Sequence, residues 1–346
     1  MKKILILGGT LFLGRVLVES LIGDPRYSII LFNRNITNSN LFQGIDRIIG
    51  DRYIVNDFKK LSQHKYDCVI DTTGYFPDFL ENELQILKDR VDRYIFISTI
   101  SAYEFSAHDN IFREDSPTLP CSEKQKLDKA TMAFGNLSKP VPHLYGAKKA
   151  ECERILLNTP WIDPIILRPA LIYGKYDFCD RFYYWLYRAK TQDKILVPSK
   201  GKEVQNNTYV SDLVNIIKQA IEIKTHSKVY NVTTHEPCTI LENLEIMRKH
   251  FNTNPTYVTV PNFFLKLNRI RPYHDIPSLW DGNNIITDSS KLKKEFICNF
   301  TSYEDSIAQT IYYNSQFDWK EGKDGMSVNK EQEIINYYIK NKNLLA

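Results

Sequence analysis

The chain has 346 residues, 43% of them hydrophobic and 25% charged, which is enough for one large domain or two closely packed ones. Its 45 basic and 41 acidic residues are interspersed, so the composition favours neither a nucleic-acid-binding nor a membrane-binding protein. No stretch holds roughly 18 uninterrupted apolar residues, so no transmembrane span is expected. The six cysteines form no C-x-x-C pair, which favours reduced thiols and a cytoplasmic location.

The first half of the chain alternates short apolar runs with amphipathic segments. The apolar runs predict six strands: 3–7, 28–32, 46–49, 68–70, 94–97 and 164–167. Apolar residues at helical spacing predict the helices between them: 12–22, 80–91 and 145–157. This alternation predicts an α/β fold with a doubly wound parallel (Rossmann) sheet and helices on both of its faces.

After Pro169 the pattern becomes irregular and predicts a smaller α+β lobe. A helix is expected at 212–223 and a strand at 229–232, whereas segments 104–142, 178–187 and 252–277 are expected to be loops. The aromatic side chains within 182–187 have helical spacing, which favours a core position over stacking on a ligand.

These patterns predict three parts in the chain. The dinucleotide-binding domain is expected at 1–172 with about 205–225, the substrate lobe at 173–204 and 226–315, and a polar extension at 316–346.

A glycine-rich turn joins the first predicted strand to the first predicted helix: Gly8-Gly9-Thr10-Leu11-Phe12-Leu13-Gly14. Glycine lets the backbone approach a pyrophosphate, and the helix N-terminus adds N–H donors and a positive dipole. We therefore expect this turn to bind a dinucleotide. Leu11 stands where the G-x-x-G-x-x-G pattern has its middle glycine, and the alternative is a tight turn without a ligand.

The end of the second predicted strand bears on which dinucleotide binds. Asn33-Arg34 stands where an NAD site usually has a carboxylate for the ribose 2′-OH. Because Arg34 could pair with a 2′-phosphate, NADP is favoured over NAD, unless Arg34 points to solvent. Asp51 could accept a hydrogen bond from the adenine, or it could cap a loop. Further residues expected to line the cofactor follow the third and fourth strands: Arg52, Thr72, Thr73 and Gly74.

Tyr145-Gly146-Ala147-Lys148-Lys149 places a phenol and an ammonium four residues apart at the start of a helix, on one face. A free phenol has a pKa near ~10, too high for a base at neutral pH. A neighbouring ammonium favours the phenolate, so Tyr145 and Lys149 are the candidate catalytic pair. Lys149 could also hold the nicotinamide ribose. The alternative is an ordinary amphipathic helix start.

Other motifs follow in a fixed order along the chain. Ser98-Thr99-Ile100-Ser101 ends the fifth strand, Arg168-Pro169-Ala170-Leu171-Ile172-Tyr173-Gly174 ends the sixth, and Arg271-Pro272-Tyr273-His274-Asp275 comes later. With the turn and the Tyr-Lys pair, these motifs resemble the extended short-chain dehydrogenase/reductase family, in its nucleotide-sugar epimerase/dehydratase group.

The resemblance implies a role for each motif. Thr99 would donate to the reacting oxygen, and Pro169 and Ile172 would lie near the nicotinamide. Ser101 and Tyr173 would contact the substrate, and Arg271 would grip its phosphates.

Some features depart from the main group. Ile100-Ser101 replaces the Asp-Glu of dehydratases, and Asn206-Asn207 replaces an Arg-Asp that grips phosphate. The turn and Gly50-Asp51-Arg52 resemble a divergent branch that includes chloroplast stem-loop RNA-binding proteins and bacterial reductases.

We therefore expect an NAD(P)-dependent epimerase or reductase acting on a nucleotide-sugar or a related alcohol. The resemblance implies a homodimer, which is common in the family. No metal is expected, because the histidines lack metal-ligand spacing. The alternative is a non-catalytic nucleotide- or RNA-binding protein on the same fold.

Overall fold

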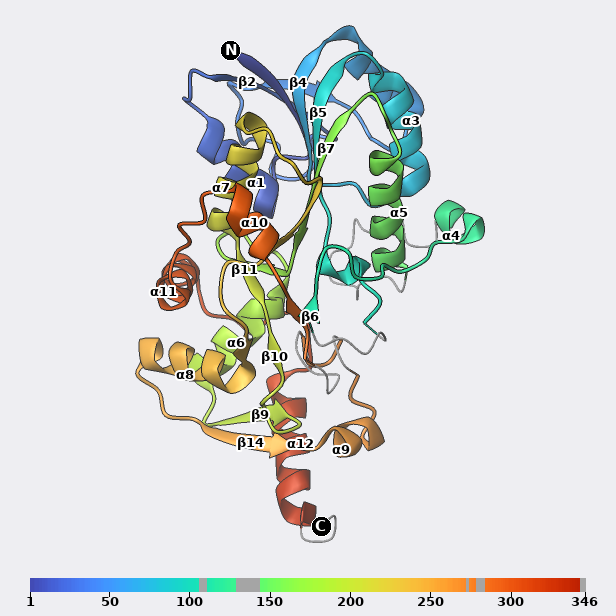
Figure 1. Cartoon of the computed structure of the whole chain (residues 1–346). Helices are drawn as coiled ribbons and strands as arrows, with labels where there is room; N and C mark the ends of the chain where they lie inside the picture. Colours follow the sequence, from blue (N-terminus) through green and yellow to red (C-terminus); the bar gives the residue numbers. More distant parts are fainter. Residues whose placement is uncertain (106–110, 129–143, 272–273, 278–283, 343–346) are drawn as a thin grey trace.

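The computed structural model describes residues 1–105, 111–128, 144–271, 274–277 and 284–342. A sheet of seven parallel strands forms the upper part of the molecule (Figure 1), with the order β3-β2-β1-β4-β5-β7-β12. Its strands are β1 (Lys2–Leu7), β2 (Tyr27–Asn33), β3 (Asp46–Ile49), β4 (Tyr66–Asp71), β5 (Val91–Ile97), β7 (Asp163–Pro169) and β12 (Val229–Val232). This is the predicted doubly wound α/β arrangement.

The central strands β1, β4, β5 and β7 are buried over most of their length because both faces of the sheet are covered. In β1, Ile4 and Ile6 belong to one hydrophobic cluster, and Leu5 and Leu7 belong to the other. Successive side chains of a strand point to opposite faces, so each cluster fills one face. The first cluster lies under α1 (Phe12–Leu21) and α7 (Val210–Glu222), and the second under α3 (Pro77–Leu87) and α5 (Tyr145–Leu157).

Shorter elements link or extend these layers. They are α2 (Val55–Phe58), η1 (Lys59–Gln63), η2 (Ile100–Ala102), β6 (Ile111–Phe112) with β15 (Ile286–Thr287), α4 (Glu123–Leu127), β8 (Leu171–Tyr173) with β11 (Asn207–Tyr209), and α10 (Ser290–Glu295).

A smaller lobe lies below the sheet in Figure 1. Its elements are α6 (Asp180–Thr191), β9 (Lys194–Pro198) paired in parallel with β14 (Thr256–Val260), β10 (Val204–Gln205) paired with β13 (Cys238–Thr239), α8 (Ile240–Phe251), α9 (Asn262–Leu267), α11 (Tyr303–Asn314) and α12 (Val328–Asn341).

Several sequence-based expectations differ from this structure. Most of segment 178–187 belongs to α6, which buries Phe182, Tyr184 and Trp185. Segment 252–277 contains β14 and α9. The long polar segment 104–142, of which 106–110 and 129–143 lie outside the described residues, contains β6 and α4.

One helix end and the assignment of one strand also differ from the prediction. The helix predicted to reach Val91 ends at Leu87, and Val91 opens β5 after a turn at Asp89, whose φ is +61°. The strand at 229–232, predicted to belong to the substrate lobe, is instead the edge strand of the large sheet, because it pairs with β7.

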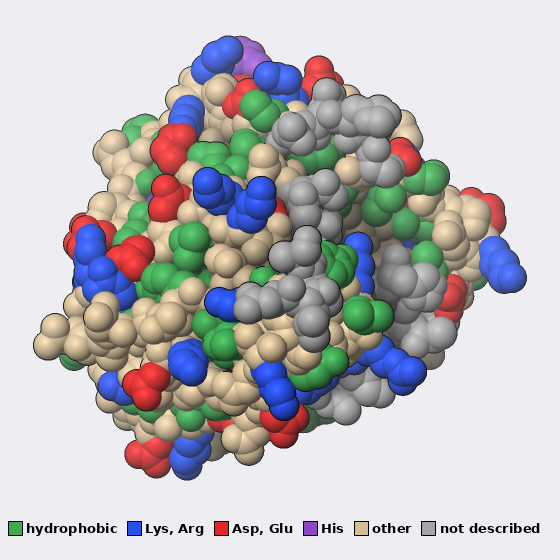
Figure 2. Space-filling model, turned by 90° about the horizontal axis from the view of Figure 1, so that it is seen from below, with side chains coloured by type: hydrophobic (Ala, Val, Ile, Leu, Met, Phe, Trp, Pro, Cys, Tyr) green, Lys and Arg blue, Asp and Glu red, His purple; other side chains and the backbone are tan. Residues whose placement is uncertain are grey.

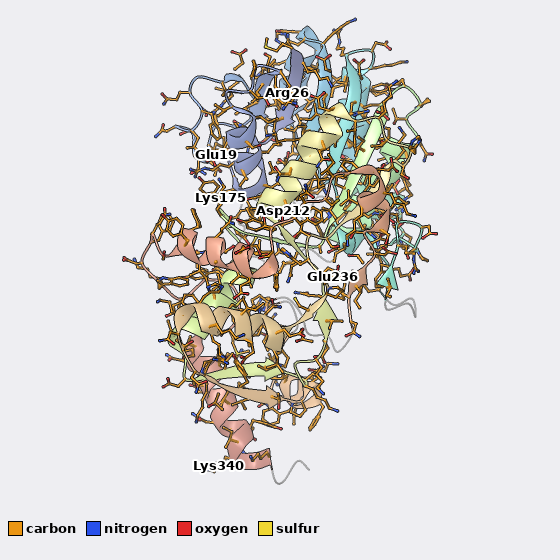
Figure 3. All side chains as sticks on the ribbon, turned by 60° about the vertical axis from the view of Figure 1, so that its left-hand side comes forward. Glu19, Arg26, Lys175, Asp212, Glu236 and Lys340 are labelled. Atoms are coloured by element: carbon orange, nitrogen blue, oxygen red, sulfur yellow. The ribbon has the colours of Figure 1, made fainter. Side chains whose placement is uncertain are left out.

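The predicted polar extension is an integral part of the smaller lobe. Glu331 of α12 is fully buried and forms an ion pair with Arg188 of α6. Its second oxygen accepts a hydrogen bond from the backbone N of Leu196, at 2.9 Å. Further along α12, Ile335 is also fully buried, and Lys340 lies near the far end of the helix (Figure 3). Within the described ranges, no helix has the length and apolarity needed to cross a bilayer.

Candidate active site

The glycine-rich turn leaves β1 at the edge where the parallel strands end. Gly8 and Gly9 have φ values of +107° and +97°, which side chains with a Cβ rarely adopt. A Cβ on Gly14 would lie 2.8 Å from the backbone N of Gly9, so glycine lets α1 begin directly against the turn. Leu11, in place of a glycine, is the N-cap of α1 with extended backbone, and the next residue, Phe12, takes a φ of +41°.

Side chains from neighbouring strand ends hold the carbonyl groups of this turn. Thr72 Oγ1 donates to the Leu7 carbonyl and Asn33 Nδ2 to the Gly8 carbonyl, each at 2.8 Å. Asn38 Nδ2 donates to the Thr10 carbonyl, also at 2.8 Å. The turn is therefore fixed in shape before any ligand binds, and the Asn33 amide has a structural role in it.

The residues expected to recognise the adenosine end lie around β2 and β3. Arg34 is exposed at the end of β2. Asp51 Oδ1 accepts a hydrogen bond from the Tyr53 backbone N at 3.0 Å, and the Asp51 N donates to the Asp57 carboxylate at 3.0 Å. Asp51 therefore caps the loop after β3, which is the alternative that its sequence position left open.

Arg52 does not face a ligand, contrary to the expectation from its sequence position. Its five N–H groups donate to the carboxylates of Asp71 and Glu83 and to Thr73 Oγ1. A guanidinium has five such donors, so none is left over for a cofactor. Asp71 is fully buried, and its Oδ1 also accepts from the Thr73 backbone N at 2.9 Å. Arg52 thus stabilises the 72–74 loop through Asp71 and Thr73.

Tyr145, Thr99 and Lys149 come together where β5 ends and α5 begins. A Cβ on Gly146 would lie 2.0 Å from the Ser101 carbonyl O, so glycine allows the first turn of α5 to pack against η2. This contact brings Tyr145 into hydrogen-bonding range of Thr99. The Lys149 side chain, 2% exposed, donates to the carbonyls of Gly74, at 2.8 Å, and Ile97.

Burial shifts the pKa values of both candidate catalytic groups. Burial raises the pKa of the Tyr145 phenol, while the nearby Arg181 guanidinium and the hydrogen bond with Thr99 act in the opposite direction. Burial lowers the pKa of Lys149 to about 8. Different charged neighbours act on the two groups, because Arg181 favours the phenolate of Tyr145 whereas Asp71 and Glu153 favour the ammonium of Lys149.

The residues expected to contact substrate are not all placed together. Tyr173 is fully buried, and its hydroxyl bonds to Ser306 Oγ at 2.6 Å and to His235 Nε2 at 2.8 Å, so it belongs to the core between the lobes. The Arg271 side chain is 62% exposed and is paired with Asp275 at 3.3 Å. Residues 272–273 of its motif lie outside the described residues.

The remaining predicted residues surround the Tyr145 cluster or lie beside it. Ser101 is half-buried, and its N donates to Thr99 Oγ1 at 3.1 Å. Pro169 is buried at the end of β7, and Ile172 is half-buried in β8.

One residue near Tyr145 was missed. Arg181, in the first turn of α6, interacts electrostatically with the Tyr145 phenol. The signal available in the sequence was an arginine next to Asp180, ahead of an aromatic run with helical spacing. That run was interpreted only through its aromatic residues.

Comparisons with known proteins bear on the family and the fold of this chain. Chloroplast stem-loop binding protein of 41 kDa b from Arabidopsis thaliana is 24% identical over 247 residues, covering 67% of this chain and 58% of that protein. The match therefore spans less than two thirds of the relative's length.

Two solved structures share the fold at low identity. dTDP-glucose 4,6-dehydratase from Bacillus anthracis, solved with NAD, has a TM-score of 0.68 and 16% identity, covering 92% of this chain and 98% of that chain. UDP-glucuronic acid 4-epimerase from Bacillus cereus, solved with UDP-glucuronic acid and NAD, has a TM-score of 0.67 and 20% identity, covering 91% and 99%. The model of the NAD dependent epimerase/dehydratase family matches residues 4–233, more than half of the chain. The resemblance seen in the motifs is thereby confirmed, and the chain belongs to the NAD dependent epimerase/dehydratase family.

Proposed function

We propose that this protein is an NAD(P)-dependent epimerase or reductase that acts on a hydroxyl or keto group of a nucleotide-activated sugar. The observation that carries the proposal is the cluster of Tyr145, Thr99 and Lys149 beside the end of β5. It lies at the same edge of the sheet as the glycine-rich turn after β1. Ligands of open parallel sheets bind at this edge, where the strand order reverses.

The turn fits a dinucleotide pyrophosphate. A Cβ on Gly8 would lie 2.7 Å from Thr72 Oγ1, and a Cβ on Gly14 would meet the Gly9 backbone. Glycine at both positions therefore allows the turn to fold tightly. The N-terminus of α1 points to the same place. We favour NADP because β2 ends in Asn33-Arg34 without the carboxylate of a typical NAD site, and a guanidinium there can pair with a 2′-phosphate.

The bound nicotinamide would accept or return a hydride. Thr99 Oγ1 would donate a hydrogen bond to the substrate oxygen, and Tyr145 Oη would remove or return its proton. Lys149 has three N–H donors, of which the Gly74 and Ile97 carbonyls take two, so one remains for a ribose hydroxyl. The positive charge of Arg181 and the hydrogen bond with Thr99 favour the phenolate form of Tyr145.

The Tyr145→Phe variant tests this mechanism. It should lose turnover by at least about 100-fold, because it removes the only proton carrier proposed at the site, while nicotinamide cofactor binding is retained. The assay follows nicotinamide absorbance and sugar products with UDP-glucose, UDP-glucuronic acid and dTDP-glucose as substrates. Tyr312, which is 70% exposed, supplies the matched control Tyr312→Phe. Unchanged turnover in Tyr145→Phe would refute the mechanism. Mass spectrometry of any copurified nucleotide separates NADP from NAD.

The curated relative's name favours a second candidate, an RNA-binding protein on this fold. On the face shown in Figure 2, Lys and Arg side chains are interspersed with acidic and apolar ones and form no continuous basic surface. RNA binding predicts salt-dependent retention of stem-loop RNA that Tyr145→Phe leaves unchanged. We prefer the enzyme because Tyr145 and Lys149 are both present and Thr99 is in hydrogen-bonding range of Tyr145.

A further inference from the structure

The segment between β8 and α6 crosses the sheet edge from the glycine-rich turn to the catalytic cluster. The guanidinium carbon of Arg15 on α1 lies 3.6 Å from the centre of the Tyr176 ring. Phe178 packs edge-on against Phe12, with ring centres 6.1 Å apart. Lys175 pairs with Glu19 of α1 at 3.0 Å, and Figure 3 shows these two side chains meeting between the lobes. The first turn of α6 follows and is thereby held over the site.

Arg181 in that turn differs from the other buried arginines of the chain. Arg52 pairs with two carboxylates, Arg168 with Glu153, and Arg188 with a glutamate of α12. Arg181 forms no ion pair with any carboxylate of the described ranges; its side chain hydrogen-bonds with Cys179, but its Nε is buried without a hydrogen-bond partner. Burying a cation without an ion pair costs folding free energy, so we expect the Arg181 guanidinium to have a function in the site.

The acidic groups near Arg181 do not neutralise it. Asp180 is engaged by the C-terminal segment, because its Oδ2 accepts hydrogen bonds from the backbone N atoms of Lys323 and Asp324, the latter at 3.2 Å. Burial raises the pKa of Asp177 to about 7, although Arg181 acts to lower it. Asp177 is therefore only partly ionised at neutral pH and leaves much of the Arg181 charge available.

We propose that Arg181 binds an anionic group of the substrate, a phosphate or carboxylate, directly beside Tyr145. A guanidinium suits either oxyanion because its planar donors match two oxygens at once. Arg181 thus takes the role that the sequence motif gave to Arg271, whose side chain is mostly exposed and already paired with Asp275. The inference rests on the proposed function, since it places the anion next to the reacting hydroxyl.

Isothermal titration calorimetry on the cofactor-saturated protein tests the inference, with UDP and glucuronate as separate probes. Arg181→Met should weaken binding of at least one probe by about 10- to 100-fold, the range of a charge-assisted hydrogen bond. Arg181→Lys, which keeps the charge, should recover part of the affinity. A loss with UDP identifies a phosphate as the ligand, and a loss with glucuronate identifies a carboxylate.

Arg26 provides the control, because it is exposed at the opposite end of β2 (Figure 3), and Arg26→Met should bind both probes as the wild type does. Cofactor binding by each variant shows that it is folded. Wild-type affinity in Arg181→Met, or no binding of either probe to the cofactor-loaded wild type, would overturn the inference. Failure of the wild type to bind any nicotinamide dinucleotide would instead refute the proposed function.

Discussion

Replacing Glu83 with glutamine should change how the stability of this protein depends on pH. Glu83 is 1% exposed, and its carboxylate shares the Arg52 guanidinium with Asp71. Burial raises the pKa of Glu83 to about 7, even though Arg52 acts to lower it. Burial also opposes ionisation of Asp71, but the attraction and hydrogen bonds of Arg52 outweigh it, and the pKa of Asp71 is lowered. One guanidinium thus keeps only one of the two carboxylates fully ionised.

The sign of the effect follows from the two states of Glu83. Its carboxyl titrates near 4.5 in the unfolded chain and near 7 in the folded protein. Between these values the folded protein binds more protons, so the free energy of unfolding falls as the pH rises. The loss approaches about 1.4 kcal/mol per pH unit and amounts to about 2 kcal/mol between pH ~5 and ~7. Glutamine does not titrate and still offers Arg52 an acceptor oxygen.

The assay is urea unfolding followed by fluorescence of the four tryptophans at pH values from ~5 to ~8. The stability of Glu83→Gln relative to wild type should rise by about 2 kcal/mol from pH ~5 to ~7 and then level off. Glu81, on the same helix but 45% exposed at its side chain, supplies the control Glu81→Gln, which should show little pH dependence. A difference for Glu83→Gln that stays constant over this range would refute the reasoning.

Two further predictions concern the smaller lobe and the cofactor. Arg188→Met should lower the free energy of unfolding by about 3–5 kcal/mol in urea titrations, because it leaves the Glu331 carboxylate buried and unpaired, whereas Arg188→Met with Glu331→Met should lose much less. Equal losses in the two would contradict this. Arg34→Glu should weaken NADP binding at least about 10-fold relative to NAD in fluorescence titrations, because the new carboxylate repels a 2′-phosphate, and parallel weakening of both would argue against NADP.

The sheet could be predicted from the sequence because its determinants are local. A run such as residues 4–7 is apolar at every position, which is typical of a strand buried on both faces. The smaller lobe could not be predicted in the same way. Helix α6 carries its apolar side chains among charged and aromatic ones, and β12 has nothing in its sequence that assigns it to the large sheet. The position of β12 is fixed by pairing with β7, which lies some 60 residues earlier in the chain.

In the candidate site, too, local spacing could be interpreted from the sequence, whereas contacts between distant residues could not. Tyr145 and Lys149 are four residues apart in α5, a spacing that predicts one helix face, and their joint catalytic role stays a prediction. Arg52 was misplaced because its partners, Asp71 and Glu83, lie 19 and 31 residues away and are invisible to spacing. Tyr173 was expected at the substrate for its place in a motif, but contacts from α11 bury it.

The buried ion network of Arg52, Asp71 and Glu83 and the side chain of Lys149 contact the same short loop. Asp71 accepts hydrogen bonds from Arg52 and from the Thr73 backbone N, and the carbonyl of Gly74, the next residue, accepts from Lys149. A Cβ on Gly74 would lie 2.5 Å from Asp71 Oδ2, so this loop is pressed directly onto the carboxylate. Because Lys149 donates to a carbonyl of the loop that this carboxylate helps to fix, the ion network helps to position the lysine ammonium.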